Sequence, residues 1–132
     1  MGYTGIATPH DLTNDATVRT TGSSPASYCG GIAGQVGGDT VGFENCNVGS
    51  STGSQKTISG AGEGNWAKAN AAGLFTSVSS SRAWDFTGCK VLNGTKCQNM
   101  TVTSENLNSA LIGNNKPPTS VTNPPTLVDS FE

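Results

Sequence analysis

Few residues of this chain have side chains suited to chemistry. Its only histidine is His10, and its four cysteines, Cys29, Cys46, Cys89 and Cys97, include no C-x-x-C pair. Zinc sites usually combine such pairs with histidines, so we expect no metal site and no cofactor. Two disulfide bonds in an oxidising compartment fit an even cysteine count, with buried free thiols as the alternative. Four cysteines allow three pairings.

Carboxylates are the other candidates, because polysaccharide-cleaving enzymes need two of them in one groove. The acidic side chains considered are Asp39, Glu44, Glu63, Asp85 and Glu105. Only Glu44 and Asp85 fall near equivalent positions of the internal repeat described below. The glycine-rich stretch 60–64 lacks the lysine and the following helix of a phosphate-binding loop. We therefore expect solvated carboxylates, no catalytic residue and no enzyme activity.

The composition favours β structure with a sparse core. Gly, Thr, Ser and Asn make up 62 of the 132 residues, whereas Val, Ile, Leu and Phe together make up 23. The net charge is −2 and the seven basic residues are scattered, which argues against a nucleic-acid partner. No apolar run reaches the roughly 18 residues that a membrane span needs. Glycines interrupt every candidate for an amphipathic helix, so we expect little helix.

Three sequence landmarks recur along the chain and indicate an internal repeat. The pattern F-x-x-C-x-V occurs at 43–48 and again at 86–91, an offset of 43 residues. A glycine-rich element with a central aliphatic residue occurs around Ile32, Leu74 and Leu111. A threonine followed by a β-branched residue occurs at 17–18, 57–58 and 101–102. Each cycle would thus contain three short strands joined by polar loops.

From this repeat we predict an all-β fold, namely a parallel β-solenoid (β-helix) of about two and a half turns. The cross-section would be roughly triangular, with about 40–44 residues per turn. The repeats would span 17–113, as 17–56, 57–100 and a partial copy at 101–113. Stacked equivalent residues would form the core ladder: Val18, Ile58, Val102, Ile32, Leu74, Leu111, Phe43, Phe86, Val48 and Val91. Cys46 and Cys89 would also share a ladder, at a spacing that permits a disulfide.

The glycine-rich element and the cysteine strand together resemble the GLUG-type repeats of large bacterial and protist surface proteins. The best match is Gly30-Gly31-Ile32-Ala33-Gly34 continuing to Asn45-Cys46, with weaker echoes at 72–75 and 109–113. The resemblance covers about residues 17–113. It implies a β-solenoid in an extracellular, adhesive or structural protein, and it carries no catalytic residues.

The two ends of the chain are expected to control assembly, because an open stack of strands exposes unpaired backbone. Residues 1–16 would form an N-terminal cap or arm. Residues 114–132 contain two Pro-Pro pairs and would form a C-terminal arm or a linker to a further domain. As an assembly arm, Thr126-Leu127-Val128 would add a strand to a neighbouring copy.

We therefore predict a structural or adhesive module at the cell surface or outside the cell. It would join end to end into a filament, or contact neighbouring domains or surface glycans. The rivals are a carbohydrate- or ice-binding module and a fragment of a polysaccharide-cleaving β-helix. Trp66, in a polar loop, could contact a sugar or form a lid. The sequons at Asn93 and Asn99 are candidate glycosylation sites, and unused sequons are the alternative.

Overall fold

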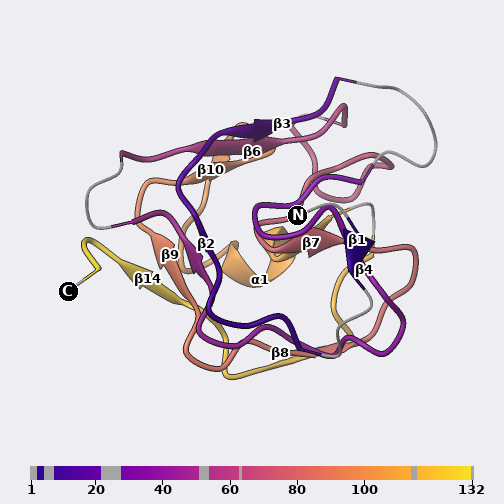
Figure 1. Cartoon of the computed structure of the whole chain (residues 1–132). Helices are drawn as coiled ribbons and strands as arrows, with labels where there is room; N and C mark the ends of the chain where they lie inside the picture. The colour runs from indigo at the N-terminus through magenta and orange to yellow at the C-terminus, as the bar shows by residue number, and fades with distance from the viewer. Residues whose placement is uncertain are drawn as a thin grey trace.

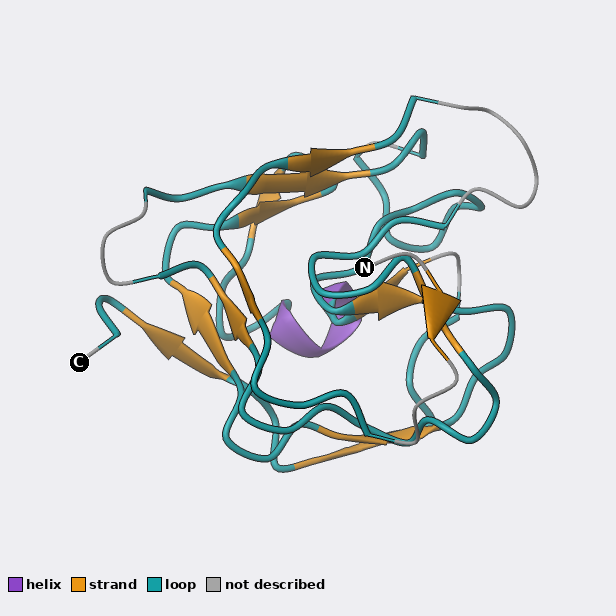
Figure 2. Cartoon of the chain, in the orientation of Figure 1, coloured by secondary structure: helices purple, strands orange, loops and turns teal. Residues whose placement is uncertain are grey.

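The computed structural model describes residues 3–4, 8–21, 28–50, 54–62, 64–113 and 116–131. In these ranges the chain forms short β-strands and one helical turn, α1 (Leu107–Ala110), as Figures 1 and 2 show. The strands are β1 (Tyr3–Thr4), β2 (Thr13–Asn14), β3 (Val18–Arg19), β4 (Gln35–Val36), β5 (Asn47–Val48), β6 (Thr57–Ser59), β7 (Thr76–Ser77), β8 (Ala83–Asp85), β9 (Lys90–Leu92), β10 (Lys96–Cys97), β11 (Met100–Thr101), β12 (Ile112–Gly113), β13 (Ser120–Thr122) and β14 (Thr126–Val128). None of the described helical residues forms a segment long and apolar enough to cross a membrane.

The described strands form four small sheets in which almost every pair is parallel. Their orders are β1-β4-β7-β12, β2-β5-β9-β14, β3-β6-β10-β11 and β8-β13. Among the described pairs, only the β10–β11 hairpin is antiparallel. In the first three sheets the strands follow each other in chain order, so strands from the N-terminal part lie at one edge and strands from the C-terminal part at the other (Figure 1).

The predicted β-solenoid of two and a half triangular turns is wrong. The chain is all-β and mostly parallel, but its strands belong to four separate small sheets and not to one stacked solenoid. The offset between paired residues is also not constant. Val48 lies opposite Val91, 43 residues later, whereas Val91 lies opposite Leu127, only 36 residues later. A single repeat length therefore does not describe the pairing.

Backbone conformation explains why the strands stop after two or three residues. β5 lies between Asn45, with a φ of 51°, and Gly49, with a φ of 107°. Likewise β9 lies between Gly88 (φ 70°) and Gly94 (φ 89°). A positive φ turns the chain out of the extended conformation, and asparagine and glycine are the residues that tolerate it best. Corners placed so closely leave only short ladders between them.

The glycine-rich segments form an inner layer that the three-sided prediction did not include. Figure 2 shows β7 and α1 inside the outline made by the other strands. The Gly31 N–H donates to the Gly73 carbonyl (3.1 Å), and the Leu74 N–H donates to the Ala110 carbonyl (2.7 Å). A Cβ added at Gly31 would lie 2.2 Å from the Leu74 oxygen and 2.8 Å from the Ile58 Cδ1. These backbones approach each other too closely for a side chain at Gly31.

The structure buries nine of the ten residues expected in the core ladder, and leaves Val18 half-buried. The pairing within that group differs from the expected one. Ile58 lies opposite Val18 on one side, but on the other side it lies opposite Cys97. Val102 follows the β10–β11 hairpin, and its N–H donates to the Thr95 carbonyl (2.9 Å). The third threonine landmark therefore marks the end of a hairpin.

Four aromatic side chains fill much of the core and offset the small number of aliphatic residues. The Phe75 ring centroid lies 5.4 Å from that of Phe43 and 4.8 Å from that of Phe86, both tilted. Trp84 stacks on Phe43 with centroids 6.0 Å apart. All four are essentially inaccessible to solvent. Such pairs add stability beyond the burial of apolar area.

Parts of both terminal segments are paired with strands of the same chain. In the segment expected as a C-terminal arm or linker, β13 pairs with β8 and β14 pairs with β9. Pro124 and Pro125 lie between β13 and β14, so they interrupt neither ladder. In the segment expected as an N-terminal cap, β1 pairs with β4 and β2 pairs with β5. In the described structure, Thr126-Leu127-Val128 thus contacts its own chain.

Candidate functional site

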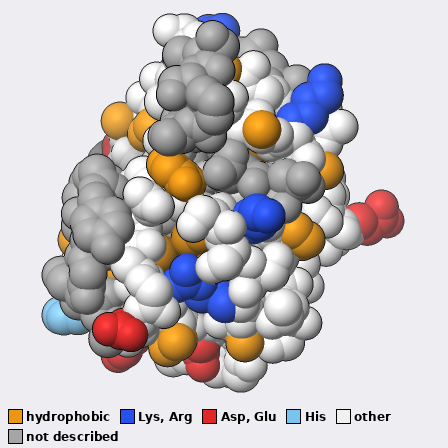
Figure 3. Space-filling model, turned by 90° about the vertical axis from the view of Figure 1, so that its right-hand side faces the viewer, with side chains coloured by type: hydrophobic (Ala, Val, Ile, Leu, Met, Phe, Trp, Pro, Cys, Tyr) orange, Lys and Arg blue, Asp and Glu red, His pale blue; other side chains and the backbone are white. Residues whose placement is uncertain are grey.

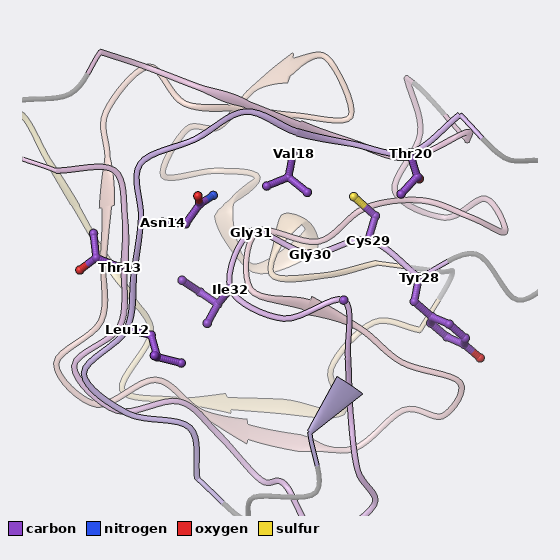
Figure 4. A pocket seen from close by; sticks show the side chains of 11 residues that line it. Leu12, Thr13, Asn14, Val18, Thr20, Tyr28, Cys29, Gly30, Gly31 and Ile32 are labelled. Carbon is purple, nitrogen blue, oxygen red and sulfur yellow. The ribbon is translucent and has the colours of Figure 1, made fainter. Parts of the chain in front are cut away.

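Residues from the N-terminal part of the chain, between Leu12 and Gly34, line an open hollow of about 350 Å³. Figure 4 shows Asn14, Val18 and Ile32 pointing toward its middle, while Thr13 points outward. Leu12 and Val18 are only half-buried, although both pack against the hydrophobic core. The opposite end of the core holds α1, whose Leu107 and Ala110 are buried. The N-terminal end is therefore the more open of the two.

Strand β2 is an edge strand whose unpaired side can be identified residue by residue. The Asn47 N–H donates to the Leu12 carbonyl (2.8 Å), and the Gly49 N–H donates to the Asn14 carbonyl (2.7 Å). Because successive residues of a strand direct their backbone groups to opposite sides, the N–H and C=O of Thr13 point away from β5. Thr13 therefore presents a donor and an acceptor at the free edge.

Strand β14 is the opposite edge of the same sheet. The Thr126 N–H donates to the Cys89 carbonyl (3.1 Å), and the Asn93 N–H donates to the Val128 carbonyl (2.7 Å). The N–H and C=O of Leu127 consequently point away from β9. The sheet thus ends in one outward donor–acceptor pair on each side, Thr13 at one edge and Leu127 at the other.

The four cysteines are free thiols, which is the alternative to two disulfide bonds. Cys29, Cys46, Cys89 and Cys97 are all buried. Their sulfurs donate weakly to backbone oxygens, for example Cys89 to Phe43 O (3.4 Å) and Cys97 to Ala72 O (3.4 Å). Burial raises the pKa of Cys97 to about 12. A hydrogen bond with the Cys89 thiol lowers the pKa of Cys46, and the same contact raises that of Cys89.

The two carboxylates proposed for polysaccharide cleavage do lie near each other. Glu44 and Asp85 line one shallow pocket of about 220 Å³. Hydrogen bonds from the side chain and N–H of Thr87, and from the Asn123 amide, hold the pKa of Asp85 below its ordinary value. An acid that protonates a leaving group needs the opposite shift. Asp85 therefore holds its own turn together through Thr87 and links that turn to Asn123.

Ice binding would require the threonines of the repeated Thr landmark to form one flat array, and they do not. Lys96 lies between Thr57 and Thr101 in the sheet, and Arg19 lies opposite Ser59. Ser59 itself is buried. Charged side chains thus interrupt the face that would have to match ice.

Both sequons lie at exposed turns. The Asn93 amide donates to Asp129 (2.9 Å), and Asn99, with a φ of 60°, is at the tip of the β10–β11 hairpin. The surface in Figure 3 is mostly uncharged and polar, with small separate hydrophobic areas. Among the described residues, Val41 is the one large hydrophobic side chain that is strongly exposed. The described part of the face in Figure 3 therefore carries no broad apolar patch.

Sequence reasoning missed β2 because residues 1–16 matched none of the three landmarks. A weaker signal exists at the corners. Asp11, Asn45 and Gly88 each precede a strand by two residues, and each adopts a positive φ. All three are residue types that tolerate this conformation, so a search for such corners could have placed β2 beside β5.

Comparison of the chain with protein-family models, with curated proteins and with solved structures finds no match. The resemblance to GLUG-type repeats therefore rests on the sequence motifs alone.

Proposed function

We propose that this chain is an extracellular structural or adhesive module that associates end to end with copies of itself. The observation that carries the proposal is the strand order. Three sheets run from an N-terminal strand at one edge to a C-terminal strand at the other. An edge that exposes backbone donors and acceptors is a template for another strand. Contact between two different edges of one molecule repeats from copy to copy and produces an open chain.

The hydrogen-bond pattern of the second sheet supports a specific register for this contact. Within the chain, Thr13, Asn47, Lys90 and Thr126 follow one another as partners. Continuing the ladder places Thr13 of the next copy opposite Thr126. The outward Leu127 N–H would then donate to the Thr13 carbonyl of the next copy. This repeats the pattern of a parallel ladder, in which the Asn14 N–H is directed to β5 within the chain. The same pattern directs the Thr13 N–H toward the Pro125 carbonyl.

The location outside the cell and the adhesive role are supported by the resemblance to GLUG-type surface repeats and by the uncharged, Ser-, Thr- and Asn-rich composition. Partners in this role are further copies of the chain or neighbouring domains of a longer protein. The depressed pKa of Asp85 does not suit this residue to be the proton donor of a polysaccharide-cleaving pair.

The test is the size of the purified chain as a function of concentration, measured by sedimentation velocity and negative-stain microscopy. We expect particles that lengthen with concentration. Thr13→Pro removes the outward N–H at the edge, where proline is tolerated, and should shift the protein to monomer. Thr13→Val is the matched control, since it keeps the N–H and should assemble as the wild type does.

Two results would overturn the proposal. One is a wild-type chain that stays monomeric at every concentration reached. The other is a Thr13→Pro variant that assembles as well as Thr13→Val while retaining the wild-type circular dichroism spectrum.

A further inference from the structure

A second surface feature lies away from β2 and β14. Two pockets of about 280 and 270 Å³ adjoin, since Ser109 and Pro117 line both of them. The first pocket also contains Asn65, Trp66, Ala67 and Ile112, and the second contains Asn108, Pro118, Ser120 and Val121. We call the two pockets together the Trp66 groove. Its walls come from the loop after β6, from α1 and from the segment that leads into β13.

The charge of the groove restricts its ligand. The chain has sixteen charged side chains from nine acidic and seven basic residues, yet the described residues lining the groove include no Asp, Glu, Lys, Arg or His. An anionic or cationic ligand would lose hydration there without gaining an opposite charge. The groove therefore fits an uncharged ligand.

The polar groups of the groove are amides and hydroxyls. The Asn65 Oδ1 accepts a hydrogen bond from the Ala67 N–H (2.8 Å), which orients that amide and leaves its NH₂ group as a donor. Asn108 and Ser109 are exposed on α1, and the Asn108 amide makes no hydrogen bond with another of the described residues. Neutral donors and acceptors on two walls suit a ligand rich in hydroxyl groups.

Trp66 supplies a rigid aromatic wall. It is partly exposed, it packs against the hydrophobic core, and its Nε1 atom is buried. An indole fixed in this way offers an apolar surface without the entropy cost of ordering a flexible side chain. The C–H face of a sugar ring is an apolar surface rimmed by hydroxyls, which matches such a wall flanked by amides.

We infer that the Trp66 groove binds a neutral oligosaccharide, with one sugar against Trp66 and the next beyond Ser109 toward Pro118 and Ser120. This inference does not depend on end-to-end assembly, because neither β2 nor β14 contributes a residue to the groove. It adds a ligand-binding role to the proposed structural one.

Intrinsic fluorescence provides a direct assay, because the chain has two tryptophans and Trp84 is fully buried. The full chain is titrated with the neutral hexasaccharides of cellulose, xylan, chitin, starch and mannan, and with hexagalacturonate as the anionic comparison. We expect at least one neutral hexasaccharide to change the emission of Trp66 and hexagalacturonate to have no effect. Calorimetry on the same pairs measures the Kd independently of fluorescence.

The variant is Ser109→Gln, which fills the junction of the two pockets without adding charge. Ser104→Gln is its matched control, because Ser104 is exposed and lies outside the groove. We expect Ser109→Gln to raise the Kd at least tenfold and Ser104→Gln to leave it unchanged. Trp66→Phe should keep weaker binding by calorimetry but lose the fluorescence change.

The inference is overturned if no neutral hexasaccharide binds, if hexagalacturonate binds equally well, or if the two serine variants weaken binding to the same extent. A change in the oligomeric state of Ser109→Gln, with no loss of sugar binding, would instead identify the groove as a contact between copies and would also overturn it.

Discussion

Gly31 provides the sharpest test of the inner layer. In Gly31→Ala the new methyl group would lie 2.2 Å from the Leu74 carbonyl oxygen and 2.8 Å from the Ile58 Cδ1. Side chains can rotate, but the Leu74 oxygen belongs to a backbone whose neighbours are hydrogen-bonded, so two backbone segments must separate. Overpacking in a close-packed interior costs about 1–3 kcal/mol, and more where backbone must move. We therefore expect a loss of about 3 kcal/mol in the free energy of unfolding.

The loss can be converted into a melting temperature. The entropy of unfolding of a 132-residue chain is about 0.28 kcal/mol/K, so each kcal/mol lowers the Tm by roughly 4 °C. Gly31→Ala should therefore melt about 10 °C below the wild type when unfolding is followed by circular dichroism. Urea titration should give the same loss in free energy with an unchanged m-value.

Gly38→Ala is the matched control. Gly38 is exposed, its φ is outside the left-handed region, and a Cβ there meets no atom within 4 Å. Alanine at such a position stabilises by about 0.4–1 kcal/mol, because it restricts the unfolded chain. A Gly31→Ala variant that melts within about 2 °C of Gly38→Ala would show that the backbones at Gly31 and Leu74 do not approach each other as closely as described.

Two further substitutions test buried polar contacts and charge. Gln98→Ala removes the oxygen that accepts from the Gly60 N–H (2.6 Å) and the Ala72 N–H (2.8 Å), so two buried amides lose their partner. We expect urea titration to show a loss of about 2–5 kcal/mol in the free energy of unfolding. A loss below about 1 kcal/mol would refute the role of Gln98. Asp85→Asn should lower the Tm at neutral pH. Because the folded pKa of Asp85 is depressed, its contribution to stability is present above the ordinary pKa of an aspartate and is lost as the pH falls through the folded pKa. The difference in Tm from the wild type should therefore shrink as the pH falls below the ordinary pKa of an aspartate, and a difference that is constant with pH would refute this role.

The sequence predicted some pairings correctly because several residues shared one spacing. F-x-x-C-x-V places Val48 opposite Val91, as the offset of 43 residues requires. The Thr-Val dipeptide at 101–102 carried less information, since β-branched residues favour strands without specifying a partner. Cys97, a small side chain on β10, lies opposite Ile58 at the position predicted for Val102. Loops of unequal length between landmarks make register unreadable from dipeptides alone.

The solenoid prediction was wrong for a physical reason that concerns the glycines of the chain. Several glycines lie at corners with a positive φ, whereas Gly30, Gly31, Gly73 and Gly113 are positions where an added Cβ would lie less than 3 Å from another part of the backbone. Sequence does not distinguish a glycine needed for a positive φ from one needed for close approach. Because glycines permit this close approach, the glycine-rich segments that were predicted as part of the outer wall lie in the interior.

The candidate sites differ in how much of each could be predicted from the sequence. Trp66 was visible as an aromatic residue in a polar loop. Ser109 belongs to a glycine-rich landmark expected in a wall and Asn108 directly precedes that landmark, and only folding brings these two residues near Trp66. The outward backbone of Thr13 and Leu127 has no side-chain signature, because any residue other than proline can supply it. Its presence follows from which residues pair inward.

The two proposals reinforce each other if both hold. In an end-to-end polymer the Trp66 groove recurs once per copy, since it uses neither edge of the β2-β5-β9-β14 sheet. A shallow, uncharged groove forms few strong contacts with a sugar, so each site alone is expected to bind weakly. Repetition along a polymer raises the strength of binding to a glycan-coated surface by about 10²–10⁴ without any new contact. Thr13→Pro should therefore abolish adhesion to a surface coated with the bound hexasaccharide while leaving the Kd for the free hexasaccharide unchanged.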